Sequence, residues 1–197
     1  MATGGCRIYS HSQQSFCFRE ASMFLSKKGF HLIRPDTGVI IALDDEGDSY
    51  EISYELACQK VEGAEPFAVE LWLDSESTMP WTLCLEDNVS IQDFHFFSLD
   101  NMQIELASKT LFEFFLIERT KQNMLGIYID KFGHTTEDID WDEFFVEENV
   151  TLKDLPDTVC VLQDKLKNIK ADTSHHVLTM IDNYALITSD LEILSCI

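Results

Sequence analysis

The segment FHLIR-PDTG-VIIAL-DDEGD-SYEIS, residues 30–53, decides the fold class of this 197-residue chain. Its three short runs, residues 30–34, 39–43 and 49–53, are rich in the β-branched and aromatic residues that favour strands. PDTG and DDEGD separate these runs, and their Pro, Asp and Gly residues favour tight turns. The segment therefore predicts a β-meander.

The rest of the chain contains further strand signals. Trp72 alternates with a leucine on each side, as expected for a strand with one buried face. Asp182 and Asn183 lie between two apolar runs and form a two-residue loop that accepts positive φ, which predicts a hairpin. Residues 157–162 favour no single type of element. Further strands are predicted at residues 67–73, 80–86, 91–99, 125–130, 176–181 and 184–188.

Helical signals are fewer than strand signals. Gly29 follows two lysines and is a typical helix stop. Helices are predicted at residues 12–28, 54–61 and 103–123, and from Thr135 or Thr136 to about residue 149. Strands occur in runs instead of alternating strictly with helices. We therefore expect an α+β fold in one domain, residues 1–197, with a largely antiparallel sheet, a C-terminal hairpin and several packed helices.

The composition is that of a folded protein in a reducing compartment. Hydrophobic residues make up 45% of the chain and fourteen residues are Phe, which excludes a disordered acidic tail. The N-terminal residues show no apolar signal-peptide core, and no apolar run approaches the roughly 20 residues that cross a bilayer. The six cysteines are scattered without a CxxC pair, which is typical of reduced thiols. We expect a cytoplasmic protein.

The net charge of -21 is the main functional signal. Between Arg34 and Lys109, seventeen Asp and Glu residues face one basic residue, Lys60. A second acidic block, residues 137–157, holds nine carboxylates and only Lys153. Such a field repels nucleic acids and anionic membranes, and it steers basic partners towards the protein. We therefore expect a basic protein partner, with no nucleic acid and no membrane contact.

No motif predicts a cofactor, a metal site or an active centre. Asp138, Asp140 and Asp142 match positions 1, 3 and 5 of a calcium loop. Glu143, however, stands where that loop requires glycine, and Asn149 stands where it requires a bidentate glutamate. The cysteines and histidines show neither zinc-site spacing nor the local context of a nucleophile, and phosphate-binding glycine loops are absent. We expect no catalytic, cofactor or metal site, and therefore a protein that is not an enzyme.

The densest acidic segment, EDIDWDEFFVEE at residues 137–148, mixes seven acids with three aromatic residues. One interpretation is an amphipathic helix with its aromatic side chains in the core. The other is a docking surface in which Trp141 is an anchor rimmed by carboxylates. The predicted partner-binding residues are Asp138, Asp140, Trp141, Asp142, Glu143, Glu147 and Glu148, with the turn residues Asp44, Asp45, Glu46 and Asp48 as second choice.

In size, acidity and lack of catalytic motifs, the whole chain resembles the immunity proteins of bacterial toxin–immunity pairs. The resemblance implies a protein that neutralises a cognate toxin, frequently a basic nuclease, by direct binding. It rests on no shared motif, so it assigns no site residue. Three alternatives stay open: a nucleic-acid mimic, an adaptor or chaperone for a basic protein, and an enzyme whose site has no familiar pattern.

Overall fold

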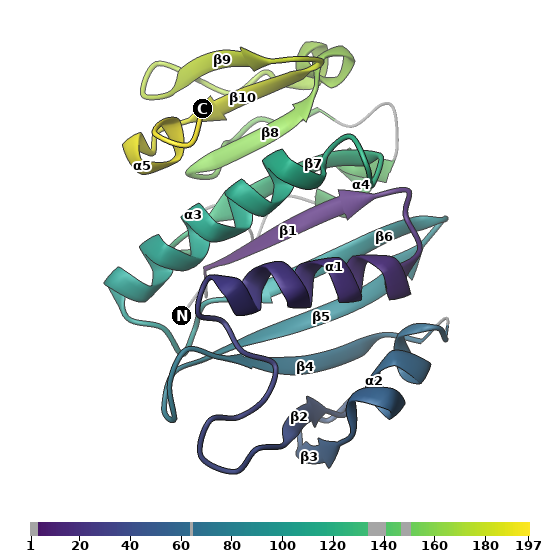
Figure 1. Ribbon diagram of the computed structural model, residues 1–197. Helices are drawn as coiled ribbons and strands as arrows, with labels where there is room; N and C mark the ends of the chain where they lie inside the picture. Colours follow the sequence, from purple (N-terminus) through teal and green to yellow (C-terminus); the bar gives the residue numbers. More distant parts are fainter. Residues whose placement is uncertain (1–3, 64, 134–140, 147–150) are drawn as a thin grey trace.

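The computed structural model of the chain describes residues 4–63, 65–133, 141–146 and 151–197. Its strands form one antiparallel sheet in the order β3-β2-β4-β5-β6-β1-β7-β8-β10-β9 (Figure 1). The strands are β1 Gly5–Ser10, β2 Ile40–Leu43, β3 Ser49–Ile52, β4 Phe67–Trp72, β5 Thr78–Glu86, β6 Val89–His95, β7 Met124–Asp130, β8 Thr158–Leu162, β9 Val177–Ile181 and β10 Tyr184–Thr188. The helices are α1 Gln14–Lys27, α2 Tyr54–Val61, α3 Asn101–Glu118, α4 Trp141–Val146, α5 Leu191–Leu194 and the short 3-10 helix η1 Gln163–Asn168.

Strand β1 lies inside the sheet, where it pairs with β6 on one side and with β7 on the other. Its side chains alternate between two buried environments. Cys6 and Ile8 are fully buried in the larger core, whereas Tyr9 belongs to a smaller cluster on the opposite face. By the same alternation, Arg7 shares the face of Tyr9.

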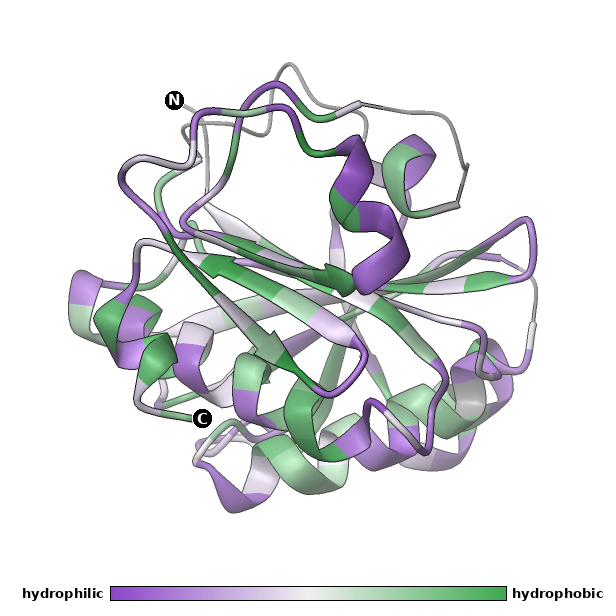
Figure 2. Cartoon of the chain, turned by 90° about the horizontal axis from the view of Figure 1, so that it is seen from above, coloured by the Kyte–Doolittle hydropathy of each residue, from purple (hydrophilic) through white to green (hydrophobic). Residues whose placement is uncertain are grey.

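Two hydrophobic layers hold the sheet between them. Helices α1 and α3 cover one face, and they contribute Phe18 and Phe115 to the larger core. On the other face, Trp141 and Phe145 of α4 pack against Tyr128 of β7 and its neighbours. Figure 2 shows the sheet from above, with the layers of helical segments on its two sides. The central part of the sheet is therefore buried on both faces.

Helix α3 begins at a capping box and ends earlier than predicted. Gln103 donates its backbone N–H to the Asp100 carboxylate at 2.9 Å, and the Gln103 side chain accepts from the Asp100 N–H at 3.0 Å. These two bonds satisfy donors that a helix start leaves free. The helix stops at Glu118, and Asn123 takes a positive φ of 45° directly before β7. The chain reverses over the residues predicted as the last helical turn.

The α+β class with a largely antiparallel sheet is confirmed, and so is the C-terminal hairpin. Strands β9 and β10 pair across Asp182-Asn183, and Asp182 has a φ of 54°. The predicted strand at residues 30–34 is wrong, because only His31 and Ile33 form isolated bridges there. The ambiguous residues 157–162 contain β8.

The helix predicted from Thr135 or Thr136 to residue 149 is described only in part. Residues 141–146 are helical, as predicted. Residues 134–140 and 147–150 lie outside the described residues. Within the part of the chain that is described, none of the helices is both long enough and apolar enough to cross a membrane.

Candidate functional site

Trp141 is a core residue, as the amphipathic-helix interpretation predicts, and it is not exposed as an anchor of a docking surface would be. Its side chain is only 2% exposed. The indole stacks on Tyr128 with ring centroids 4.4 Å apart and meets Phe144 edge-on at 6.1 Å. A second stack involves Tyr9 of β1 and Phe145 of α4, whose ring centroids are 4.1 Å apart. Packing of the large indole against these rings stabilises the fold and leaves almost none of its surface for contact with a partner.

Asp142 is tied to the central strand. The Arg7 guanidinium donates through Nη1 to both oxygens of its carboxylate at 3.1 and 3.2 Å, and through Nε to Asp93 at 2.8 Å. The Tyr9 hydroxyl also donates to Asp142, at 2.7 Å. Burial, together with Tyr128 and Asp142, raises the pKa of Tyr9, so this hydroxyl stays protonated. The Asp142 charge is therefore compensated within the chain, and it fastens α4 to the sheet.

The other predicted residues of this segment divide into two groups. Glu143 is exposed on α4. Asp138, Asp140, Glu147 and Glu148 lie outside the described residues.

The second predicted segment, residues 44–48, is an exposed turn between β2 and β3. The Asp44 carboxylate accepts the backbone N–H groups of Glu46 at 3.0 Å and of Asp48 at 2.8 Å. Gly47 has a φ of 85°, a conformation that glycine adopts without strain. Asp44 thus builds the turn, while Asp45, Glu46 and Asp48 add exposed negative charge to it.

The topology places two more acidic connections beside this turn. Leu43 pairs with Ala68, and Phe67 pairs with Leu83, so the end of β2, the start of β4 and the end of β5 share one edge of the sheet. The α2–β4 connection and the β5–β6 turn both emerge at that edge. We call the exposed carboxylates of these three connections the acidic rim: Asp44, Asp45, Glu46, Asp48, Glu62, Glu65, Glu86 and Asp87.

A tight turn fixes the β5–β6 part of the acidic rim. Glu86 pairs with Val89 across a two-residue loop. Asp87 and Asn88 both have positive φ, 47° and 66°, as a type I′ turn requires. The turn follows the twist of the strands and holds Glu86 and Asp87 at the end of a paired hairpin.

The charge of the acidic rim is not neutralised within the described part of the chain. None of the ion pairs found there involves a carboxylate of the acidic rim. Lys60 is the one basic residue between positions 44 and 87, and its Nζ lies 5.9 Å from the centroid of the Tyr50 ring. The five strands beneath the acidic rim, β3 to β6 in sheet order, span about 19 Å at the usual strand spacing. Eight like charges therefore share a short edge.

A hollow of about 460 Å³ lies beside the acidic rim. Its walls come from the end of α2, the β5–β6 turn and the β1–α1 connection. Glu62 and Leu85 both line it, and the Leu85 side chain is 42% exposed. The hollow offers an apolar wall next to a carboxylate, which suits the aliphatic stem and charged head of a lysine or arginine.

The described part of the first predicted segment, residues 141–146, does not lie beside the turn at residues 44–48. The turn at residues 44–48 follows β2, whereas Trp141 of α4 packs on Tyr128 of β7. Five strand spacings separate β2 from β7, which corresponds to about 24 Å.

Glu62, Glu65, Glu86 and Asp87 belong to the acidic rim but are missing from the sequence-based prediction. Their signal is topological, because in an antiparallel sheet alternate connections emerge at the same edge.

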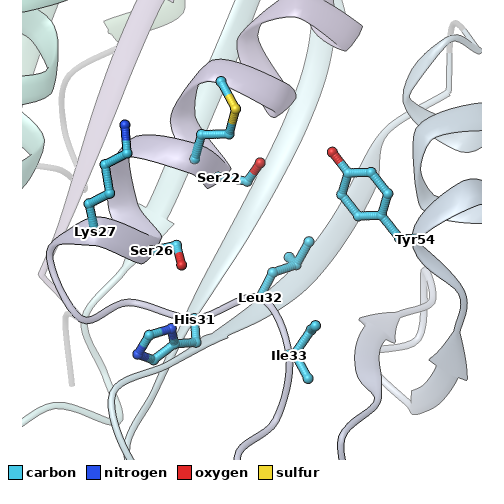
Figure 3. A pocket seen from close by; sticks show the side chains of 8 residues that line it. Ser22, Ser26, Lys27, His31, Leu32, Ile33 and Tyr54 are labelled. Carbon is cyan, nitrogen blue, oxygen red and sulfur yellow. The ribbon is translucent and has the colours of Figure 1, made fainter.

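A second hollow, an open groove of about 410 Å³, lies between α1, residues 31–33 and the start of α2 (Figure 3). Exposed Met23, Ile33 and Tyr54 give it an apolar lining, and Lys27 carries its charge. None of the predicted partner-binding residues lies in this groove.

Two cysteine thiols have pKa values that do not favour nucleophilic attack. Burial raises the pKa of Cys17 to about 11, and burial together with nearby carboxylates raises that of Cys84 to about 11. A reactive cysteine has a lowered pKa, so these thiols are of the opposite kind. Within the described ranges, no group of three His, Cys, Asp or Glu side chains could hold a metal ion.

Comparisons with known proteins find only distant structural similarity. No protein-family model matches the sequence, and no curated protein matches it. A solved structure of a Pseudomonas aeruginosa T6SS protein is similar over 94% of this chain, with a TM-score of 0.49 and 10% sequence identity. The chain spans 64% of the length of that protein. A similarity of this level carries no argument about function.

Proposed function

We propose that this chain is an acidic binding protein that neutralises a basic protein, as an immunity protein neutralises its toxin, and that the acidic rim is its contact surface. The observation that carries the proposal is the set of eight exposed carboxylates gathered by three connections without a compensating ion pair among the described residues.

In the free protein the carboxylates of the acidic rim repel one another. Like charges gathered at one edge of a sheet disfavour one another, and a basic partner relieves that repulsion. The same field accelerates encounter, up to roughly 10⁸ M⁻¹s⁻¹ or faster at low salt. The hollow beside Leu85 gives such a partner a place for one apolar contact within a charged surface.

A nuclease toxin is a suitable partner for the acidic rim because its substrate-binding surface is basic. An enzyme that binds phosphate backbones must present clustered lysine and arginine side chains. A protein that covers those side chains with carboxylates blocks access of the nucleic acid. In this proposal the chain performs no chemistry itself.

A nucleic-acid mimic is the second candidate, and the density of the acidic rim favours it. Eight carboxylates over about 19 Å give one charge per about 2.4 Å, close to the roughly 1.7 Å per charge of duplex DNA. Under this candidate the partner is a DNA-binding protein that is not a toxin. Competition by duplex DNA for the partner is expected in both cases, whereas rescue of cells from the partner's toxicity is expected only for immunity.

The test compares two variants of equal net charge. The first, the rim triple, carries Asp45→Asn, Glu46→Gln and Glu86→Gln. The second, the control triple, carries Glu55→Gln, Glu76→Gln and Asp164→Asn, which are exposed carboxylates outside the acidic rim. Each triple is used with the wild type as bait for extracts of the native host.

We expect the wild type and the control triple to retain the same basic protein in stoichiometric amount, and the rim triple to lose it. Co-expression should then suppress the toxicity of that protein. The proposal is overturned if no basic protein is retained, or if the rim triple retains it as well as the control triple does.

A further inference from the structure

Strand β9 is an open edge of the sheet. It pairs with β10, and none of the other described strands pairs with it (Figure 1). Its sequence, VLTMI, holds no charged residue. Val177, Leu178 and Met180 are 46%, 54% and 46% exposed. Natural edge strands usually carry charges or proline that prevent further pairing, and β9 carries neither.

The other edge of the sheet, β3, shows the contrast. It has four residues, one of which is the exposed Glu51, and it directly follows the acidic turn at residues 44–48. Exposed apolar side chains instead concentrate near β9. Of the fifteen large hydrophobic side chains exposed among the described residues, five lie between positions 177 and 197: Val177, Leu178, Met180, Leu191 and Ile197.

The hydrogen-bond pattern shows which backbone groups of β9 face outward. Gln163 donates its N–H to the Asn183 carbonyl at 2.8 Å, so Asn183 faces β8 and the next residue, Tyr184, faces β9. Tyr184 pairs with Ile181. Because backbone groups alternate along a strand, the N–H and C=O groups of Leu178 and Met180 point away from β10.

The segment that leads into β9 carries no net charge, so it adds little to the repulsion between two copies. Residues 151–181 hold four lysines and four aspartates, a net charge of zero in a chain of -21. The acidic rim lies over β3 to β6, and β1, β7, β8 and β10 separate those strands from β9. Two molecules can therefore approach through β9 while their acidic rims stay apart.

We propose that a second copy of this chain pairs with β9 through its own β9, antiparallel about a two-fold axis at Thr179. In this register Leu178 and Met180 of each copy exchange backbone hydrogen bonds with Met180 and Leu178 of the other. All four outward N–H groups and carbonyls of each edge are then used, and Val177 lies opposite Ile181 of the second copy. The two sheets become continuous, and apolar side chains meet on both faces. This inference is independent of the proposed function.

The first test is the molar mass of the protein, measured by light scattering across a concentration series. Leu178→Lys places a charge on the edge, and Met180→Pro removes one outward N–H without touching the β9–β10 bonds. Each should raise the dimer dissociation constant by at least about tenfold. Met102→Lys, at a side chain that is 83% exposed on α3, is the matched control and should dimerise as the wild type does.

The second test fixes the register. Two residues directly opposite each other outside the hydrogen-bonded pairs have Cα atoms about 4.5 Å apart, within the range of a disulfide. Thr179→Cys should therefore form an intermolecular disulfide under mild oxidation. Val177→Cys should form none above the wild-type background, because its counterpart lies opposite Ile181.

The dependence on ionic strength distinguishes dimerisation through β9 from binding of a basic partner. Screening weakens the repulsion between two acidic copies, so dimerisation should strengthen with ionic strength, whereas binding to a basic partner should weaken. The rim triple should dimerise normally. A wild type that stays monomeric at all concentrations overturns the inference. So does an unaffected Leu178→Lys dimer, or cross-linking equal for Thr179→Cys and Val177→Cys.

Discussion

Replacing Trp141 by alanine tests the division between core and contact surface. The indole is 2% exposed, so the substitution removes nearly all of about 250 Å² of buried aromatic surface. At about 25 cal/mol per Å² this area corresponds to about 6 kcal/mol. Compact denatured chains already bury part of it, which reduces the value to about 4–5 kcal/mol, within the usual range for Trp→Ala in a core.

The assay is equilibrium unfolding by urea and by heat. We expect Trp141→Ala to lower the free energy of unfolding by about 4 kcal/mol and Tm by roughly 10 °C. Trp141→Phe is the matched control. It keeps a ring against Tyr128 and should lose less than about half as much.

The same variants should bind the basic partner with an unchanged dissociation constant wherever they are folded. A loss of stability below about 1 kcal/mol, together with binding weakened by about 2 kcal/mol or more, would refute this reasoning. In that case Trp141 would be an interface anchor, and the acidic segment at residues 137–148 would be the contact surface.

Two further predictions concern Arg7 and Cys17. Arg7→Met leaves the Asp93 and Asp142 carboxylates without the guanidinium that pairs with them, and the free energy of unfolding in urea should fall by about 3 kcal/mol. Arg19→Met, at an exposed ion pair, is the control and should lower it by less than about 1 kcal/mol. Equal losses in the two variants would contradict the anchoring role of Arg7. Burial raises the pKa of Cys17 from 9.0 to about 11, so its thiol contributes stability that is complete below pH 9 and lost as the pH rises through about 11. The free energy of unfolding should therefore fall over that pH range, and less so in Cys17→Ala; an identical pH dependence of the two proteins would contradict this.

The sequence predicts most strands of the sheet but misses β1, which lies inside it. The β9–β10 hairpin is recognisable because Asp182-Asn183 lies between two apolar runs. Strand β1 is not, since Arg7 interrupts its apolar residues, and only the carboxylates of Asp93 and Asp142, supplied by distant segments, make that arginine acceptable there. Residues 30–34 show the converse. Their composition suits a strand, but they form only two isolated bridges.

The candidate site depends on topology in the same way. The turn at residues 44–48 is visible in the sequence as a run of acids. Nothing in the sequence distinguishes Glu86 and Asp87 from other acidic pairs. Only the strand order β2-β4-β5-β6 brings them to the same edge of the sheet as the turn at residues 44–48. The chemistry of Asp142 is likewise invisible in the sequence, because its partners Arg7 and Tyr9 lie more than a hundred residues away.

The most direct test of the central claim is the association rate of the retained basic partner with the wild type, the rim triple and the control triple. It is measured by stopped flow from low to high ionic strength. The account predicts that the rate for the wild type falls steeply as the Debye length shrinks from about 10 Å at 0.1 M salt to about 3 Å at 1 M. At low salt the rim triple should associate at least about tenfold more slowly than the control triple, although both carry the same net charge. Equal rates for the two triples, or a wild-type rate indifferent to salt, would contradict the claim that the acidic rim meets the partner.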